Sequence, residues 1–341
     1  MKKILLVFAL LLLAGCLCPY LLGGSKDVLE LVPKSANVVL IVRPSAILND
    51  SDLSSLYNYG GTAYNKQRIE TTTGIDPTKI DRIVLFTEVN SLKSTDNSYG
   101  AFIARGTMDK NTVLDKMRVD NYVTQLSYGG QDLYEISSKQ SPGDVSYFSF
   151  LDSSTLVGGT KEAVEDSIDT NAGKMDSVKT RQNLSQIYDA LDKNSLIILL
   201  MDIPQQMKRE ISQSLSSQPN FQALSQIDCI GLSAVKNSKN INIKMLVTAD
   251  DASSATDVSD AFDKGLSTLK GVAPAGSTIE TIANKLSVDA KGVTVTVNLQ
   301  TTSNELNSLI GELSSLGGAN SQGGTGAGDN GSSIQGIILP G

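Results

Sequence analysis

The sequence contains the stretch KIDRIVLF at residues 79–86 and a related stretch, QIDCIGLS, at residues 226–233. The two stretches share the pattern Ile-Asp-x-Ile, which begins at Ile80 and again at Ile227. Short runs rich in aliphatic and β-branched residues are typical of buried β-strands. The recurrence therefore predicts a fold in which one series of elements occurs twice.

The elements before each stretch repeat as well. The apolar run VVLIV at residues 38–42 is followed by Pro44, and the run LIILL at residues 196–200 is followed by Pro204. Each run predicts a buried strand, and a helical stretch is expected after each proline. In the first copy Asp52 can cap a helix over residues 53–59, and in the second Met207, Ile211 and Leu215 lie on one helical face. A strand and a helix are therefore expected ahead of both Ile-Asp-x-Ile stretches.

The elements after each stretch continue the parallel. Each copy is expected to add a third strand (99–104 and 241–248), a helix behind acidic capping residues (from Asp109 and from Asp250-Asp251), a hairpin (122–137 and 285–299) and a closing helix (160–168 and 303–316). The first copy has one further strand pair, within residues 147–157, and the second has no clear equivalent unless residues 293–299 serve both roles. This order predicts an α+β fold with two related modules, residues 28–175 and 176–316, built on mainly antiparallel sheets with helices packed on one face.

The N-terminus has the pattern of an export signal. Lys2 and Lys3 precede an uninterrupted apolar run, and residues 13–16, Leu-Ala-Gly-Cys, resemble the lipobox of lipoprotein signal peptides. The resemblance implies a signal peptide over residues 1–15, a lipid on Cys16 and a lipidated linker over residues 16–27. The alternative is an uncleaved signal anchor, because the uncharged stretch continues to residue 24. Both readings place the rest of the chain outside the cytoplasm, anchored to the membrane by lipid or by helix.

Composition narrows the classes of function. Hydrophobic residues make up 40% and charged residues 19% of the chain, which is typical of a globular protein, and the net charge is −7. An acidic chain without a Lys/Arg cluster is a poor match for nucleic acid. His and Trp are both absent, so the commonest general base and nitrogen ligand are missing. We therefore expect no enzymatic activity, catalytic residue, metal or cofactor.

Several residues are candidates for modification or for binding. Three Asn-x-Ser triplets, beginning at Asn49, Asn183 and Asn330, fit the glycosylation pattern. Tyr57, Tyr59 and Tyr64 lie in a Gly-containing segment and are a candidate interaction loop for a peptide or glycan, with core or edge packing as the simpler reading. The glycines at residues 158 and 159 are interpreted as a turn before a helix N-cap. Residues 317–341 are rich in Gly, Ser and Asn and predict a flexible tail.

Two motifs suggest a resemblance. The pattern Val-Pro-x-x-Ala-x-Val-Val occupies residues 32–39, and LVGGTKEAV occupies residues 156–164. Together with the N-terminal anchor and the duplicated module, they resemble a broad group of uncharacterised exported lipoproteins of archaea and bacteria. The resemblance implies an envelope location and supplies no catalytic residues.

The sequence thus favours a membrane-anchored, extracytoplasmic lipoprotein that acts as a non-enzymatic binding module for an envelope protein or glycan. One alternative is a solute-binding lipoprotein of a transporter, which would require a cleft between two lobes. Another is an envelope hydrolase, which would require a cleft that contains two carboxylates with shifted pKa values.

Overall fold

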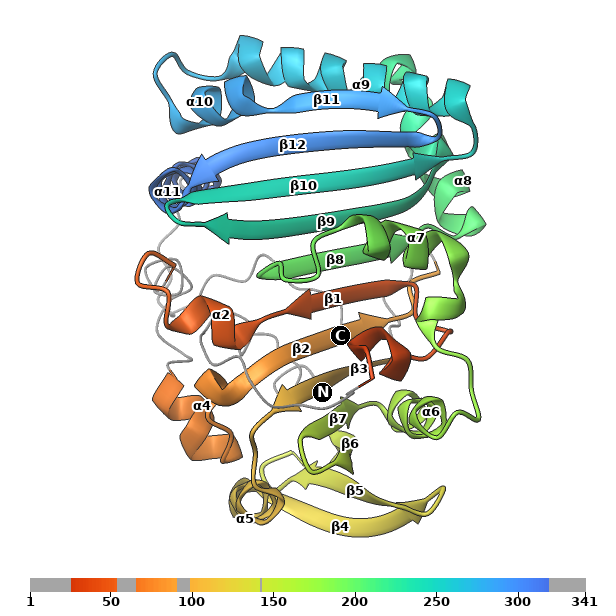
Figure 1. The fold of residues 1–341 in the computed structure, drawn as a ribbon, viewed down its shortest axis with the longest axis vertical. Helices are drawn as coiled ribbons and strands as arrows, with labels where there is room; N and C mark the ends of the chain where they lie inside the picture. Colours follow the sequence, from red (N-terminus) through yellow and green to blue (C-terminus); the bar gives the residue numbers. More distant parts are fainter. Residues whose placement is uncertain (1–25, 54–65, 91–98, 142, 319–341) are drawn as a thin grey trace, which may run out of the picture.

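The computed structural model describes residues 26–53, 66–90, 99–141 and 143–318, and these form a single twelve-stranded sheet (Figure 1). The strand order is β11-β12-β10-β9-β8-β1-β2-β3-β7-β6-β5-β4, and the described neighbours all pair in the antiparallel sense. The predicted α+β class is confirmed. The two predicted modules share one sheet.

The elements have the following bounds. The strands are β1 (Val38–Val42), β2 (Ile80–Thr87), β3 (Gly100–Gly106), β4 (Asn121–Tyr128), β5 (Gln131–Ser138), β6 (Val145–Asp152), β7 (Thr155–Gly159), β8 (Ile197–Asp202), β9 (Ile227–Asn237), β10 (Asn240–Ala249), β11 (Ser287–Lys291) and β12 (Thr294–Thr302). The α-helices are α2 (Pro44–Leu48), α4 (Lys66–Thr73), α5 (Lys110–Asp120), α6 (Lys161–Asn171), α7 (Gln182–Ala190), α8 (Gln205–Ser214), α9 (Ala252–Val272), α10 (Thr278–Lys285) and α11 (Ser303–Gly318). The short 3-10 helices are η2 (Val28–Leu31), η3 (Pro77–Lys79), η4 (Val178–Thr180) and η5 (Pro219–Gln226).

The two halves meet at the strand pair β1–β8. These are the two aliphatic runs that follow the same pattern in the sequence, and in the sheet they pair with each other, with Leu40 opposite Leu199 and Ile41 opposite Ile198. From this pair the order runs outward as β1-β2-β3 on one side and β8-β9-β10 on the other. The shared order is consistent with a duplicated module, and the duplication itself stays a prediction.

The outer strands differ between the halves. The hairpin β11–β12 lies beside β10, whereas the strand pair beside β3 is β6–β7, and β4–β5 lies further out. By position in the sheet, β12 therefore corresponds to β7, and the β4–β5 hairpin is the additional pair of the first half. The sequence pattern pairs the β11–β12 hairpin with the β4–β5 hairpin, because each follows a helix. The order of strands in the sheet instead pairs β12 with β7.

Side chains alternate between two faces of the sheet. The face that carries Val39, Ile41 and Leu200 packs against η2, α6 and α7 and is named the α6/α7 face. The opposite face packs against α2, α4, α5, α8 and α9 and is named the α5/α9 face. In the second half, α8, α9 and α11 contribute to the α5/α9 face, whereas α7 packs on the α6/α7 face, so helices cover both faces of the sheet and not one face as expected.

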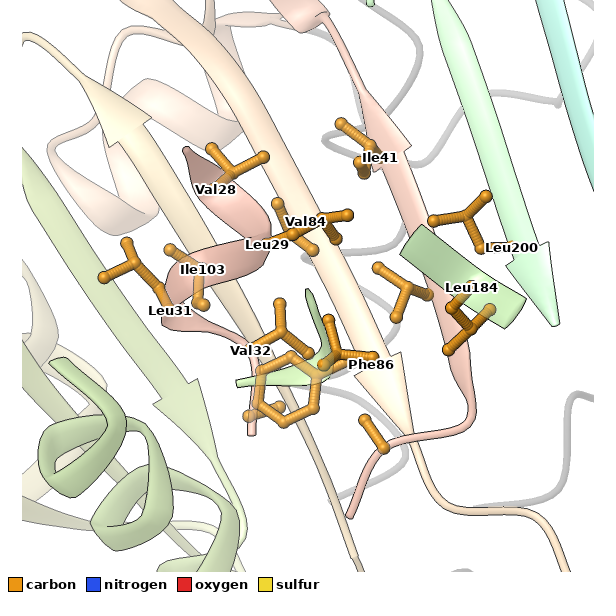
Figure 2. Packing of buried hydrophobic residues seen from close by; sticks show 14 of the residues in the cluster. Val28, Leu29, Leu31, Val32, Ile41, Val84, Phe86, Ile103, Leu184 and Leu200 are labelled. Atoms are coloured by element: carbon orange, nitrogen blue, oxygen red, sulfur yellow. The ribbon is translucent and has the colours of Figure 1, made fainter. Parts of the chain in front are cut away.

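The largest core cluster lies under η2. Val28, Leu29 and Leu31 are buried against strands β1, β2 and β3. Leu184 of α7 joins the same cluster on the same face of the sheet, from the direction of β8 (Figure 2). Its members come from both halves of the chain. The core is therefore continuous across the β1–β8 pair, and the halves are not separate domains in the packing sense.

Polar and apolar residues alternate over residues 293–299, a pattern that predicts a strand with one solvated face, and in β12 this is the α6/α7 face. Thr294, Thr296 and Asn298 lie on it and remain partly or fully exposed, whereas Val295 on the opposite face is completely buried. This part of the sheet therefore has one solvated face and one packed face.

Gly158 and Gly159 lie inside β7 and pair with β3, so the expectation of a glycine turn is wrong. A Cβ on Gly158 would lie 2.6 Å from the ring of Phe102, and a Cβ on Gly159 would overlap the backbone of Gly100. The glycines are required by close packing within the sheet. The expected N-cap is present, at Thr160.

Candidate binding site

An apolar cavity of about 240 Å³ lies between helix α9 and the strands of the second half. Its floor is the α5/α9 face of β10, β11 and β12, and its walls are α9 and η5. It is lined by Phe221, Leu224, Met245, Ala261, Phe262, Gly265, Leu266, Leu269, Leu286, Val288 and Val297. The cavity is therefore built mainly from elements of the second half that meet around one long helix.

The cavity follows from how α9 packs along its length. In the N-terminal half of the helix, Ala255 and Val258 are completely buried against the sheet. Further along, Phe262 and Leu266 continue the same apolar stripe but stay partly exposed, and Leu269 is 39% exposed. Apolar side chains four positions apart share one helix face. The stripe thus extends beyond the tightly packed contact with the sheet.

Gly265 lines the cavity and has no side chain to fill it. A Cβ at this position would lie 3.6 Å from the ring of Phe221, an ordinary van der Waals contact, so the space beyond it is free for a longer side chain or a ligand. Glycine in a helix interior costs about 0.5–1 kcal/mol relative to alanine. The structure accommodates this cost at a position that borders the cavity.

The chemistry of the cavity suits hydrocarbon. Among the described residues that line it, none carries a charge or a polar side chain. An apolar cavity of roughly 150 Å³ can bind a benzene-sized molecule, so this larger one can accept a short hydrocarbon segment. With no acid, base or nucleophile on its described walls, it can hold a ligand but supplies no group for proton transfer.

A buried lysine fixes the start of α9. Lys208 of α8 has a side chain that is only 7% exposed, and it donates hydrogen bonds to Asp228 and, at 2.9 Å, to Asp250. Burial disfavours its charge, but the two carboxylates outweigh that effect and raise the pKa of Lys208. Asp251, the next residue, caps α9 by accepting a hydrogen bond from the N–H of Ser254. The predicted acidic cap is confirmed at Asp251.

A second lysine joins the two halves. Lys236 of β9 donates to Asp50 and, at 2.9 Å, to Asp52, both of which follow α2 of the first half. Burial opposes the charge of this lysine too, and the carboxylates raise its pKa. The cluster contributes to the fit between the halves and lies apart from the residues that line the cavity.

Two carboxylates of α6 have pKa values shifted in opposite directions. Burial raises the pKa of Asp166, which accepts a hydrogen bond from Tyr99 at 2.9 Å. The hydrogen bond from Tyr128, at 2.8 Å, lowers the pKa of Asp169. Opposed shifts can mark a pair of catalytic acids. Here each carboxylate is occupied by a tyrosine hydroxyl that ties α6 to the sheet, and neither lines the cavity.

Two of the predicted modification sites lie within the described residues. Asn49, after α2, and Asn183, in the first turn of α7, are both exposed, so glycosylation at either position stays a prediction. The lipidation candidate Cys16, the triplet at Asn330 and the candidate interaction loop of Tyr57, Tyr59 and Tyr64 lie outside the described residues. Of the candidates within the described residues, neither Asn49 nor Asn183 lines the cavity.

Two features of the described residues bear on membranes and metals. Within that part of the chain, no helix combines the length and the apolar composition that a membrane span requires. The same residues contain no group of three or more His, Cys, Asp or Glu side chains placed to hold a metal ion.

Local sequence patterns do not predict the cavity, although they contain part of its signal. Phe262 and Leu266 are spaced as on one face of a helix, and apolar helix faces usually pack into a core. Phe221 and Leu224, in contrast, belong to η5, for which no element was predicted. Only the folded chain shows that these two groups leave a space between them.

Comparison with known proteins places the chain in a family. Residues 108–315 match the model of the family described as "Protein of unknown function (DUF3352)", and the chain belongs to this family. No curated protein matches the sequence.

Similar solved structures include crystal forms III and I of TP0453. Form III is 10% identical in sequence, with a TM-score of 0.46, and the match covers 84% of this chain and 99% of that one. Form I is 11% identical, with the same TM-score, and the match covers 85% and 98%. A likeness at this level carries no functional conclusion.

Proposed function

We propose that this protein is a membrane-anchored, extracytoplasmic and non-enzymatic binding module of the cell envelope, and that it binds a hydrocarbon chain of an envelope lipid or lipid-modified component. The observation that carries the proposal is the cavity beneath α9, whose described lining is entirely apolar. The N-terminal pattern that ends at Cys16 and the absence of histidine from the sequence support the location and the non-enzymatic role.

Affinity at such a site is expected to be modest. Each buried methylene contributes about 0.8 kcal/mol, so a chain of about six methylenes gives ~5 kcal/mol before the cost of association. That energy sets a lower limit of roughly 0.3 mM on the dissociation constant, because the cost of association weakens binding. A protein held at the membrane surface meets lipids at high local concentration, which suits a site of this strength.

The two alternatives have less support. Two parallel-sheet lobes with a cleft between them would support a solute-binding lipoprotein, whereas the described strands form one antiparallel sheet. An envelope hydrolase would need a cleft at a carboxylate pair, and the pair Asp166 and Asp169 is engaged by tyrosines.

The cavity can be tested by filling it. Gly265→Leu places a side chain in the cavity, and Gly271→Leu adds the same side chain to the same helix where a Cβ meets nothing within 4 Å. Both changes raise helix propensity by a similar amount. We expect Gly265→Leu to weaken binding of a dansyl-labelled undecanoic acid at least tenfold, and Gly271→Leu to leave it unchanged. The measurement is fluorescence titration of a protein that begins at Lys26, in the absence of detergent.

Two results would refute the ligand part of the proposal. One is the absence of any binding by the parent protein at millimolar fatty acid. The other is equal binding by the two leucine variants, which would place the ligand elsewhere. Thermal unfolding of each variant serves as the check that α9 remains in place.

The membrane anchor has a separate test. Cys16→Ser removes the thiol that would carry the lipid, so we expect intact-mass analysis to show loss of the lipid and fractionation to show release or stalled processing. An unchanged mass and unchanged membrane fraction would support the uncleaved signal anchor in place of the lipid.

A further inference from the structure

The two edges of the described sheet are protected to different degrees. β11 carries Asp289 and Lys291, and α9 packs along it. β4, at the opposite edge, has the sequence NYVTQLSY, with no charged residue and no proline (Figure 1). Natural proteins usually protect an edge strand with charges, prolines or a covering element, because its free backbone groups can pair with another strand. β4 has neither charge nor proline over its whole length.

The turn that follows β4 fixes which of its backbone groups point outward. Gly129 and Gly130 both have positive φ, +60° and +86°, as a two-residue type I′ hairpin requires. Such a turn makes Tyr128 and Gln131 the closing hydrogen-bonded pair. Because antiparallel pairs alternate, the N–H and C=O groups of the odd-numbered residues 121, 123, 125 and 127 point away from β5.

The exposed apolar side chains of β4 are placed symmetrically. Tyr122 is 61% exposed and Leu126 is 37% exposed. Side chains four positions apart lie on the same face of a strand, and Thr124 is midway between them. A two-fold axis at Thr124 would therefore set Tyr122 of one copy against Leu126 of the other, twice.

We propose that β4 is a self-association edge that pairs in the antiparallel sense with β4 of a second copy of this chain, about an axis at Thr124. In this register Val123 of one copy lies opposite Gln125 of the other, and both residues have outward-facing backbone groups. This register satisfies the outward hydrogen bonds and also covers both apolar side chains. Moving the axis by one residue, to Val123 or Gln125, opposes Tyr122 to Thr124 or Tyr128 in place of Leu126.

The strand that pairs with this edge is β4 of a second copy, because the two exposed apolar side chains of β4 cover each other when the strand pairs with itself. The strand has no charge for a basic or acidic peptide to recognise, and its two exposed apolar side chains complement each other across the axis. Pairing of one eight-residue strand buries less than the ~1,200–2,000 Å² of a stable interface. The dimer is therefore weak and forms mainly at high protein concentration. It involves neither the cavity nor its ligand.

A disulfide trap in the full-length chain tests the axis. Thr124 faces its own copy in a non-hydrogen-bonded pair, at a Cα separation of about 4.5 Å, which is within disulfide range. Ser127→Cys is the matched control, because two such residues would lie roughly 20 Å apart in the same dimer. In oxidised membranes we expect Thr124→Cys to give at least five times more disulfide dimer than Ser127→Cys, above the background from the native cysteines.

A second pair of variants separates pairing from folding. Gln125→Pro in the Thr124→Cys chain removes an outward N–H that β5 does not use, whereas Gln125→Ala removes the same side chain and its hydrogen bond to Asp132 but keeps the N–H. We expect the proline variant to lose the cross-link at least fivefold and the alanine variant to keep it, with the same thermal unfolding temperature for both.

Three outcomes would overturn the proposal. They are equal cross-linking at residues 124 and 127, a Thr124→Cys cross-link to a different protein, and a cross-link that survives Gln125→Pro.

Discussion

Tyrosine hydroxyls tie helix α6 to the sheet at two points. Tyr99 of the loop before β3 donates to Asp166, and Tyr128 at the end of β4 donates to Asp169. The bond to Asp169 favours the charged carboxylate and lowers its pKa from the ordinary value, and it raises the pKa of Tyr128 to about 12. Both hydroxyls therefore hold α6 against the sheet, and the hydroxyl of Tyr128 also favours the charged form of Asp169.

Tyr128→Phe should make this contribution measurable through pH. The hydrogen bond stabilises the fold while Asp169 is charged, that is, above the unfolded pKa near 3.8. The stabilisation is lost as pH falls through the lower folded pKa. We expect the variant to be about 1 kcal/mol less stable at neutral pH, and the gap to shrink below about pH 3. Denaturant titrations at about pH 6 and about pH 3 give the two values, and a pH-independent gap would contradict this account.

The buried cysteine is a residue whose environment the sequence described well. An apolar strand around Cys229 predicts a buried free thiol, and the structure confirms it. Burial raises its pKa to about 12, so the thiol stays protonated at physiological pH.

At the scale of elements, α7 lies close against the central strands. Gly231 of β9 provides the space, because a Cβ there would overlap Cγ2 of Ile187 and lie 3.2 Å from Leu191. Ile187 and Leu191 are both buried in the core cluster that spans the two halves. A small residue on the strand thus sets the distance between helix and sheet.

Gly231→Ala is expected to lower the free energy of unfolding by about 1–3 kcal/mol, because α7 must move outward or Ile187 must leave its rotamer. Gly271→Ala is the control: it lies in α9 with no neighbour within 4 Å and should raise stability by about 0.5–1 kcal/mol. Urea unfolding followed by circular dichroism measures both. Recovery of stability in the double variant with Ile187→Ala would locate the clash, and a neutral Gly231→Ala would argue against the close packing.

Some elements could not be read from local sequence. The residues of α7 and α10 show short apolar spacings, at Leu184, Ile187 and Tyr188 and at Ile282 and Ala283, that a single helical turn or a loop can also carry. They become helices because their apolar sides are covered by other segments, and isolated helices of this length are marginal in water.

At the scale of the whole molecule, the family match and the folding unit do not coincide. The matched residues 108–315 include β4–β7 and β8–β12 but omit β1, β2 and β3. Those three strands lie between β7 and β8 in the sheet. The matched region therefore covers two stretches of sheet that the strands β1, β2 and β3 connect.

Residues 108–315 expressed alone should not fold, since β7 and β8 would each lose a partner and the central cores would lose η2, β1, β2 and β3. Residues 26–318 should unfold in one cooperative transition, because the halves share one core. Hydrogen exchange and circular dichroism of the two proteins compare them. A well-folded 108–315 fragment, or two separate transitions in the longer protein, would contradict a single folding unit.

The sequence by itself determined the α+β class, most of the strands, the acidic cap of α9 and the solvated face of β12. These features depend on the alternation and capping of neighbouring residues, so they are written in local patterns. Tertiary structure alone decided that β1 pairs with β8, that β12 takes the position of β7, and that an apolar cavity forms beneath α9. The physical reason is that strand neighbours and unfilled space arise from contacts between residues distant in the chain, and local patterns do not specify which of the available apolar faces will meet.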